Sequence, residues 1–269
     1  MSFYNPTIMK YQIFQVDAFT NKIFWGNPAC VVPLFEWLPD DVLLRIAKEN
    51  AVAETAFFIE RQKDIHLRWF TPDLEIDLCG HATLAAAHAL KACLNYPFDE
   101  ITFTTLSGTL KVSYKNNFYY LNLPSRRAAK AHLPQEIKDS LNIQPKEVYK
   151  SRDYMLVYEH EEDIKEITIN RHLFDQINLG CGGVIVTAKG NSADFVSRFF
   201  TPQATILEDP VTGSAHCTLT PYWSSRLFKK ELIAHQLSER KGELICIDNN
   251  DRVSLGGQAI VYSKGLFTC

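Results

Sequence analysis

Short β-type runs fill most of the chain, and only a few stretches show helical periodicity. The run from Pro39 to Asn50 opens with a proline and two acidic residues and carries apolar residues along its interior, which predicts a short amphipathic helix. Strands are expected at 11–19, 53–60, 65–71, 101–105, 110–114, 119–123, 154–158, 183–188, 194–201, 244–247 and 259–263. Many strands with few helices indicate an α+β protein.

The segment 81–94 (HATLAAAHALKACL) has a different pattern. Ten of its fourteen positions are apolar, and six of these are alanine. A helix that is apolar nearly all round is enclosed by protein rather than lying on a surface. Its alanines would let surrounding strands come close. We interpret it as the buried central helix of a domain.

An internal repeat extends this interpretation to the second half of the chain. The string RWFTP at 68–72 recurs as RFFTP at 198–202, an offset of 130 residues. With three further residues inserted, Gly80 and the helix after it align with Gly213. The repeat predicts two pseudo-symmetric domains, each a mixed, curled, barrel-like β-sheet around a central helix, with a cleft between them. Pro221 lies eight residues into the second helix and is expected to kink it.

The boundary between the domains is expected in the polar, proline-marked stretch 122–134. An N-terminal domain is therefore predicted at 1–122 and a C-terminal domain at 123–257. For the strand near 258–269, a return to the N-terminal domain is the alternative to a place in the C-terminal domain.

The starts of the two central helices are candidate anion sites. Unpaired N–H groups and the helix dipole favour a negative charge there, and Gly80 and Gly213 would let a ligand approach the backbone. Ser214 has two interpretations, a helix cap or a ligand contact. The two helix starts together predict a small, carboxylate-bearing substrate.

Candidate acid–base residues lie close to these helix starts. Glu54 is the only charge in the apolar run 51–59, and an acid among apolar neighbours is suited to accepting and returning a proton near neutral pH. Of Glu208 and Asp209, one should point into the cleft. His81 opens the first helix and is a catalytic candidate as well as a structural one. The alternative for the acids is ordinary solvent exposure.

Cys79, beside Gly80, offers a second mechanism, in which a thiol serves as base or nucleophile. A two-thiol racemase would need a cysteine at the matching place in the second repeat. That place holds Glu208, Asp209 and Thr212, while Cys217 lies a turn inside the helix. This argues against two thiols.

The charge, hydropathy, cysteine spacing and motifs of the chain argue against several classes of partner and cofactor. The formal charge is −3, with no basic excess or stripe, so nucleic acid is not an expected partner. No window approaches the roughly 18 apolar residues of a membrane span, and no secretory leader is recognised, so no membrane partner is expected. Seven scattered cysteines without metal spacing indicate reduced thiols in the cytoplasm and no metal site. No nucleotide-binding motif is present, and no cofactor is expected.

Four motifs together resemble the phenazine-biosynthesis PhzF-like family. They are VDAFTNKIFWGNPACVV (16–32), AETAFF (53–58), RWFTPDLEIDLCGHATLAAAH (68–88) and SRFFTPQATILEDPVTGSAHCTLTPYW (197–223). The match runs in order through both halves. The resemblance implies the diaminopimelate-epimerase fold, with two similar domains, each a mixed sheet around a central helix.

The same resemblance implies a cofactor-independent isomerase. Glu54 matches the family's catalytic acid/base, and Asp209 and His81 would act as further donors or positioners. The substrate site would be lined by the matching residues Gly80, Gly213, Ser214 and Asn27. A homodimer is a further expectation at the family level. Members with these motif variants occur outside phenazine producers, so a phenazine intermediate is not implied.

Two alternatives stay open at this point. One is an amino-acid racemase or epimerase of the same fold that uses Cys79. The other is a non-catalytic binding protein built on this fold.

Overall fold

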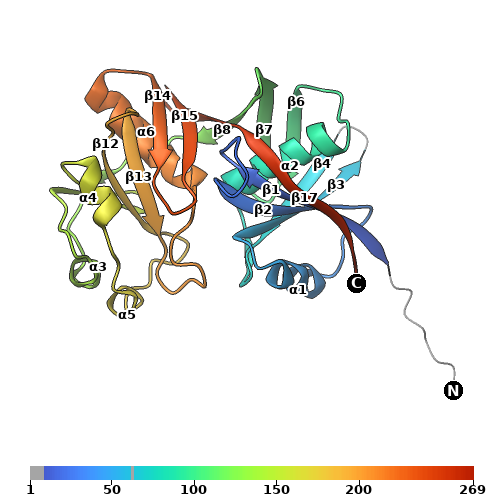
Figure 1. Cartoon of the computed structure of the whole chain (residues 1–269), viewed down its shortest axis with the longest axis horizontal. Helices are drawn as coiled ribbons and strands as arrows, with labels where there is room; N and C mark the ends of the chain where they lie inside the picture. Colours follow the sequence, from blue (N-terminus) through green and yellow to red (C-terminus); the bar gives the residue numbers. More distant parts are fainter. Residues whose placement is uncertain (1–8, 62–63) are drawn as a thin grey trace.

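The computed structural model describes residues 9–61 and 64–269. These residues form two lobes that lie side by side, with one long helix inside each lobe (Figure 1). The helices are α1 (Asp40–Asn50), α2 (Gly80–Cys93), α3 (Gln135–Ser140), α4 (Glu161–Glu166), α5 (Arg171–Phe174) and α6 (Gly213–Leu227). The two long central helices are α2 and α6.

The strands of the described residues join into one mixed sheet that runs through both lobes. In the N-terminal half they are β1 (Lys10–Ala18), β2 (Asn27–Leu34), β3 (Glu54–Arg61), β4 (Asp64–Phe70), β5 (Glu75–Ile76), β6 (Glu100–Thr105), β7 (Gly108–Lys115) and β8 (Phe118–Pro124). The remaining strands are β9 (Ala129–Lys130), β10 (Glu147–Lys150), β11 (Tyr154–Val157), β12 (Val184–Lys189), β13 (Phe195–Phe200), β14 (Glu231–Gln236), β15 (Gly242–Asn249), β16 (Arg252–Gly257) and β17 (Ala259–Thr268).

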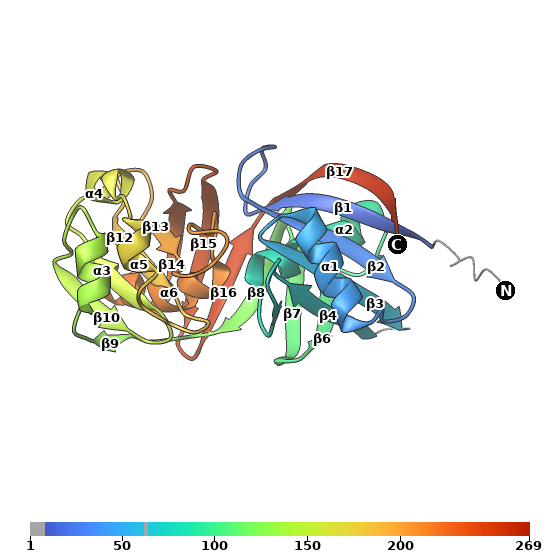
Figure 2. The ribbon, with the colours of Figure 1, turned by 90° about the horizontal axis from the view of Figure 1, so that it is seen from below.

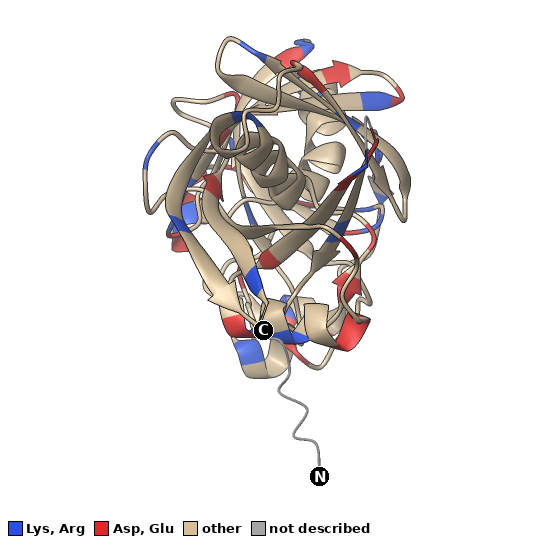
Figure 3. Cartoon of the chain, turned by 90° about the vertical axis from the view of Figure 1, so that its right-hand side faces the viewer, with Lys and Arg blue, Asp and Glu red and all other residues tan. Residues whose placement is uncertain are grey.

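The two halves repeat one topology, as the sequence repeat predicts. In the N-terminal half, β1–β2 and β3–β4 pair antiparallel, β2–β3 and β4–β6 pair parallel, and β6–β7–β8 form an antiparallel meander. Strands β10 to β16 repeat the same sequence of pairings, with α6 in the place of α2. The α+β class and the pseudo-symmetric, curled sheets are therefore confirmed. Figure 3, viewed from the N-terminal half, shows strands curling around a central helix.

Two connections join the halves. Strand β8 pairs antiparallel with β16, and β17 returns to pair along the whole of β1 (Figure 2). The last strand thus returns to the N-terminal half, where nine residue pairs join Lys10–Ala18 to Ala259–Thr268. The domain boundaries at 122 and 257 themselves remain a prediction.

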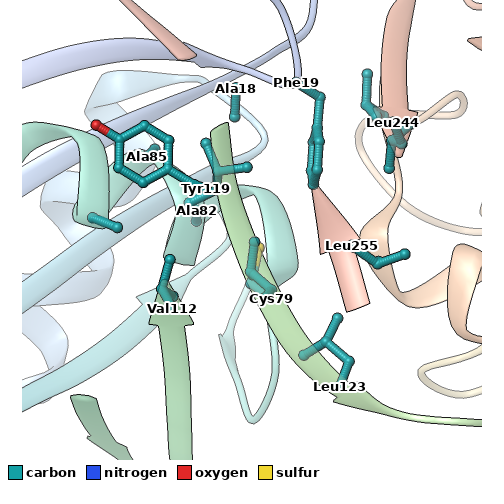
Figure 4. Close-up of a cluster of buried hydrophobic side chains, with 14 of the residues drawn as sticks. Ala18, Phe19, Cys79, Ala82, Ala85, Val112, Tyr119, Leu123, Leu244 and Leu255 are labelled. Atoms are coloured by element: carbon teal, nitrogen blue, oxygen red, sulfur yellow. The ribbon is translucent and has the colours of Figure 1, made fainter. Parts of the chain in front are cut away.

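The core explains why both long helices are so apolar. One buried cluster surrounds α2 and α6 and takes residues from both halves; Figure 4 shows part of it, with Leu244 and Leu255 of the second half beside Phe19 and Leu123. In α2, ten residues from Gly80 to Leu90 are buried. Two further clusters fill the outer faces of the sheets, one under α1 and one under α3, α4 and α5. Strand β3 is therefore buried on both faces.

Pro221 does not end the second central helix, which continues to Leu227. A proline at this position cannot donate to the carbonyl of Cys217, four residues earlier. That carbonyl instead accepts the backbone N–H of Arg126, at 2.9 Å, from the segment that follows β8. The external donor replaces the helical hydrogen bond and stabilises the turn around the proline.

Every predicted strand is present, with shifted ends, but the sequence pattern missed several elements. These are β2, β5, β9, β10, β14 and β16 and the short helices α3, α4 and α5. Two prolines in β2 argue against a strand. However, Pro28 lies where β2 pairs only with β1, and Pro33 lies where it pairs only with β3. At each proline, one side of β2 has no partner strand. The missing backbone N–H on that side therefore removes no hydrogen bond between strands.

Candidate active site

The start of α2 brings together two of the predicted catalytic residues. Glu54 is the first residue of β3, and His81 is the second residue of α2. Glu54 Oε2 lies 2.9 Å from His81 Nε2, and the two side chains are 16% and 4% exposed. Glu54 shares its strand face with Ala56 and Phe58, which pack in the cluster around α2. The apolar strand thus aims a single carboxylate at the helix start.

Asn27 connects this pair to the second half of the chain. Its Nδ2 donates to Asp209 Oδ1 at 2.7 Å and to the carbonyl of Val211 at 3.0 Å, which uses both amide protons. The same nitrogen lies 3.2 Å from His81 Nδ1. Asn27 is fully buried, at the start of β2. The amide therefore holds Asp209 against the Glu54–His81 pair across the seam between the halves.

Asp209 is fixed by hydrogen bonds on both of its carboxylate oxygens. Its Oδ2 accepts the Thr212 hydroxyl at 2.5 Å. Gln236, which is fully buried, donates to the Asp209 carbonyl at 2.8 Å and accepts the Thr212 N–H at 2.8 Å. Burial raises the pKa of Asp209 to about 6, although His81 and the hydrogen bonds from Thr212 and Asn27 oppose the shift. Near neutral pH this group can both hold and release a proton.

The carboxylate beside His81 favours a positive charge on its ring. Burial opposes the charge on its ring, but the Glu54 carboxylate beside the ring favours the charge and raises the pKa of His81 above its usual value. The Nε2–Oε2 contact is an ion pair without hydrogen-bond geometry, and neither atom has a hydrogen-bond partner among the described residues. For Cys79 the surroundings favour the neutral form. Burial raises the pKa of its thiol to about 11, and Glu54 adds to the shift. Cys79 is therefore a neutral thiol near pH 7.

Glu54, Cys79 and His81 place metal-ligand-type atoms within 4.8 Å of one another. Cys79 Sγ approaches Nδ1 of the ring at 3.5 Å, whereas Glu54 approaches Nε2. An ion held by one ring nitrogen would therefore face only one of the two other ligands. The arrangement suits a proton relay through the ring better than a shared ion.

The predicted glycines bring the two central helices into direct contact. A Cβ added to Gly80 would lie 3.3 Å from Cα of Gly213, and the reverse distance is the same. The backbone N–H groups of residues 213–215 make no hydrogen bond to any described residue. The absence of side chains at Gly80 and Gly213 thus allows the two helix starts to approach closely. The unpaired N–H groups at the start of α6 remain available to an anion.

Ser214 does not cap α6, which corrects one of its two interpretations. The N-cap residue is Thr212, and no side chain caps the helix. The Ser214 hydroxyl instead accepts a hydrogen bond from Arg152 Nη2 at 2.9 Å. Arg152 was not identified by the sequence analysis.

Glu208 has a structural contact that separates it from Asp209. It binds Arg198 through two hydrogen bonds of 2.7 and 2.9 Å, and Glu75 binds Arg68 in the same way at the matching place of the first repeat. Glu75 is thus held by Arg68 in an equivalent pair. The acid that approaches the Glu54–His81 pair is therefore Asp209.

Gln236 is a second residue that the sequence missed. Its only signal is its position at the buried end of β14, which has an alternating burial pattern. It also lines a cavity of about 180 Å³ between the halves, together with Lys22, Trp25 and Lys241. Glu54, His81 and Asp209 are not among the residues that line this cavity.

Comparison with known proteins decides the family. A family model described as phenazine biosynthesis-like protein matches residues 16–265. The chain belongs to this PhzF-like family. It is 44% identical to an uncharacterized isomerase of Pseudomonas aeruginosa, over 96% of this chain and 98% of the relative.

Solved structures agree with this membership. The crystal structure of a PhzF-family phenazine biosynthesis protein from Enterococcus faecalis superposes with a TM-score of 0.91 at 44% identity, covering 96% of this chain and 99% of that chain. A hydroxyproline epimerase from Agrobacterium vitis, with a TM-score of 0.61 at 9% identity and coverages of 96% and 92%, shares the fold. None of the described helices has the length and apolar character needed to cross a membrane.

Proposed function

We propose that this PhzF-like protein is a cofactor-independent isomerase that moves a proton on a small carboxylate-bearing metabolite. The observation that carries the proposal is the contact of 2.9 Å between Glu54 Oε2 and His81 Nε2 at the meeting point of the two central helices. Relatives of similar length are named isomerases, which supports the reaction class.

In the proposed reaction, the Glu54 carboxylate removes a proton from a carbon next to a π-system or acid group. The electron pair of the broken C–H bond moves into that π-system. A new C–H bond then forms at another carbon or on the opposite face, with a proton from Glu54 or from Asp209. Because the pKa of Asp209 is about 6, it can supply a proton near neutral pH.

The other residues bind and position. The His81 ring lies against the Glu54 carboxylate, with Nε2 2.9 Å from Oε2, and Asn27 holds Asp209. The free N–H groups at the start of α6 would bind the substrate carboxylate and stabilise the negative charge that develops on it. In this proposal Gly80, Gly213 and Ser214 line the same carboxylate site.

The thiol mechanism has less support. Cys79 is buried, its pKa is raised to about 11, and the residue aligned with it in the second repeat is Thr212. A racemase would need a thiolate on each side of the substrate. The non-catalytic alternative predicts saturable binding without turnover, and the close approach of Glu54, His81 and Asp209 argues against it. A cytoplasmic location and a homodimer stay predictions.

The test is exchange of carbon-bound hydrogen with deuterated water, followed by proton NMR on a pool of small carboxylic acids. We expect the wild-type protein to exchange at least one acid and Glu54→Gln to lose about 10²–10⁴-fold in rate. The amide is nearly isosteric, so folding should survive, and circular dichroism provides the control.

Cys79→Ala is the matched variant and should exchange at nearly the wild-type rate. Undiminished exchange by a folded Glu54→Gln protein would refute the proposal. Loss of exchange in Cys79→Ala alone would favour the racemase, and binding without any exchange would favour the non-catalytic alternative.

A further inference from the structure

Arg152 is a charged residue at the candidate site that the proposed reaction does not use. It lies between β10 and β11, directly before the fully buried Asp153. Its Nε donates to Asp153 Oδ1 at 3.0 Å, and its Nη2 donates to Asp153 Oδ2 at 2.9 Å. Nη2 also donates to the Ser214 hydroxyl at 2.9 Å. The guanidinium is therefore held in one orientation beside the start of α6.

The support beneath Arg152 is rigid. Asp153 Oδ1 also accepts the N–H of Gly183 at 2.9 Å. A side chain at position 183 would meet the Phe199 ring at 2.4 Å and the Phe200 carbonyl oxygen at 2.7 Å, so this close packing requires glycine. The buried carboxylate thus fixes the arginine from below, and the arginine side chain stays 29% exposed.

The repeat shows why this position belongs to the site. The pairing of β2 with β3 matches that of β11 with β12, so Ser151 and Arg152 correspond to Asn27 and Pro28. Gly213 corresponds to Gly80, so Ser214 corresponds to His81. Arg152 therefore corresponds to Pro28, the residue next to Asn27, and it contacts the residue that corresponds to His81.

Hydrogen-bond donors remain free at this place. A guanidinium carries five N–H donors, of which Nε uses one and Nη2 uses two. Nη1 makes no hydrogen bond to any residue that the structure describes. Because the Ser214 oxygen accepts from Arg152, its own O–H is free to donate. Two guanidinium protons and one hydroxyl proton are thus without an acceptor among the described residues.

A cation at a helix N-terminus opposes the helix dipole, so position alone does not favour Arg152 there. A bound anion would satisfy both the cation and the dipole. Asp153 already pairs with the Nε and Nη2 side of Arg152, so such an anion would bind at the free Nη1.

We propose that Arg152 is a specificity-determining residue that binds a second acidic group of the substrate, so that the preferred substrates are dicarboxylates. This inference rests on the proposed function, because it assigns a substrate class to the same site. The first carboxylate binds at the helix starts near Glu54 and His81. The second binds Arg152 Nη1 and the Ser214 hydroxyl.

The test is isothermal titration with succinate, glutarate and adipate, each compared with butyrate as the monocarboxylate probe. We expect at least one diacid to bind wild-type protein on the order of 10- to 100-fold more tightly than butyrate, as fits a hydrogen-bonded charge pair. The double variant Arg152→Met/Asp153→Asn removes both charges without leaving a buried carboxylate unpaired. It should abolish the preference and leave butyrate binding unchanged.

Further variants keep the outcome interpretable. Ser214→Ala, which leaves the arginine pair intact, should lower the preference several-fold. Arg226→Met removes an exposed arginine paired with Glu147 and serves as the matched control, with no expected change. Glu54→Gln should retain the preference, which separates binding of a diacid from proton transfer.

Equal affinities for diacids and butyrate, no binding of any diacid, or an unchanged preference in the folded double variant or in Ser214→Ala would each overturn the proposal. If the preference holds but no acid exchanges deuterium, the substrate class stands and the proposed reaction fails.

Discussion

At the start of α2, His81 meets the Glu54 carboxylate, whereas at the start of α6, Ser214 meets Arg152, which is itself held by Asp153. Each half thus places one carboxylate–cation pair beside its central helix. In the first half, the pair joins a carboxylate to an imidazole, the groups to which our proposal assigns proton transfer and positioning. In the second, it joins a carboxylate to a guanidinium, which presents a rigid, planar set of hydrogen-bond donors. One topology therefore places different chemical groups at its two helix starts, and our proposal assigns proton transfer to the first and binding of an acidic group to the second.

The reason for this difference lies in three pairs of corresponding positions. Glu54 corresponds to Gly183, where packing against Phe199 leaves no room for a side chain. His81 corresponds to Ser214. Asp209, by the spacing from the helix glycines, corresponds to the apolar Ile76. The second half has thus lost the acid at its own helix start and supplies Asp209 to the first half instead.

The comparison also extends to the two central helices, and here the largest change in stability is expected. Pro221 in α6 corresponds to His88 in α2. His88→Pro should lower the free energy of unfolding by about 3 kcal/mol or more, because it frees a buried carbonyl in a helix that has no external donor such as Arg126. Chemical denaturation measures this.

His88→Ala is the control for lost contact with the Tyr119 hydroxyl, which lies 3.1 Å from His88 Nδ1. Pro221→Ala should change stability by less than about 1 kcal/mol, because either N–H can then serve the Cys217 carbonyl. Equal costs for His88→Pro and Pro221→Ala would show that the Arg126 hydrogen bond does not compensate for the proline.

Asp209→Asn tests the acid that the second half supplies. Burial raises the pKa of Asp209 from an ordinary 3.8 to about 6, so its ionisation opposes folding, and stability is lost as pH rises from about 4 through 6. The asparagine can still accept from Asn27 and can donate to Thr212. We expect stability at pH 7.5 to rise by at most about 3 kcal/mol.

This gain in stability should vanish below pH 4. Asp209→Asn should also exchange deuterium more slowly than the wild-type protein, but the loss should be smaller than in Glu54→Gln. Thermal melts from pH 3.5 to 8 provide the measurement. A stability difference between wild type and variant that does not change with pH would contradict the raised pKa.

Gly183→Ala tests whether packing explains the missing acid in the second half. The added Cβ would meet the Phe199 ring and the Phe200 carbonyl, and overpacking of this kind costs about 1–3 kcal/mol. Gly265→Ala is the control, because a Cβ there lies 3.9 Å from the Ile13 side chain, at ordinary contact distance. Denaturant melts of both variants measure the difference. Equal stability of the two would mean that packing does not exclude a side chain at 183.

Much of the fold was readable from local pattern. The buried helix 81–94, the repeat of RWFTP as RFFTP and the amphipathic helix after Pro39 all have signals carried by neighbouring residues. The prolines of β2 misled because their cost depends on which strand lies on each side, and neighbouring residues do not carry that information. The short strands β10, β14 and β16 likewise depend on partners distant in sequence.

The sequence by itself determined the α+β class, the repeat, the buried helix and the membership of Glu54, His81 and Asp209 among the candidates. Those features arise from periodicity, from composition and from motifs. Only the tertiary structure decided that Asn27 holds Asp209 beside His81, that Glu208 pairs with Arg198 instead, and that Arg152 lies beside Ser214. The Asn27–Asp209 contact spans 182 residues of chain and the Arg152–Ser214 contact 62, distances that only folding of the sheets around two touching helices can close.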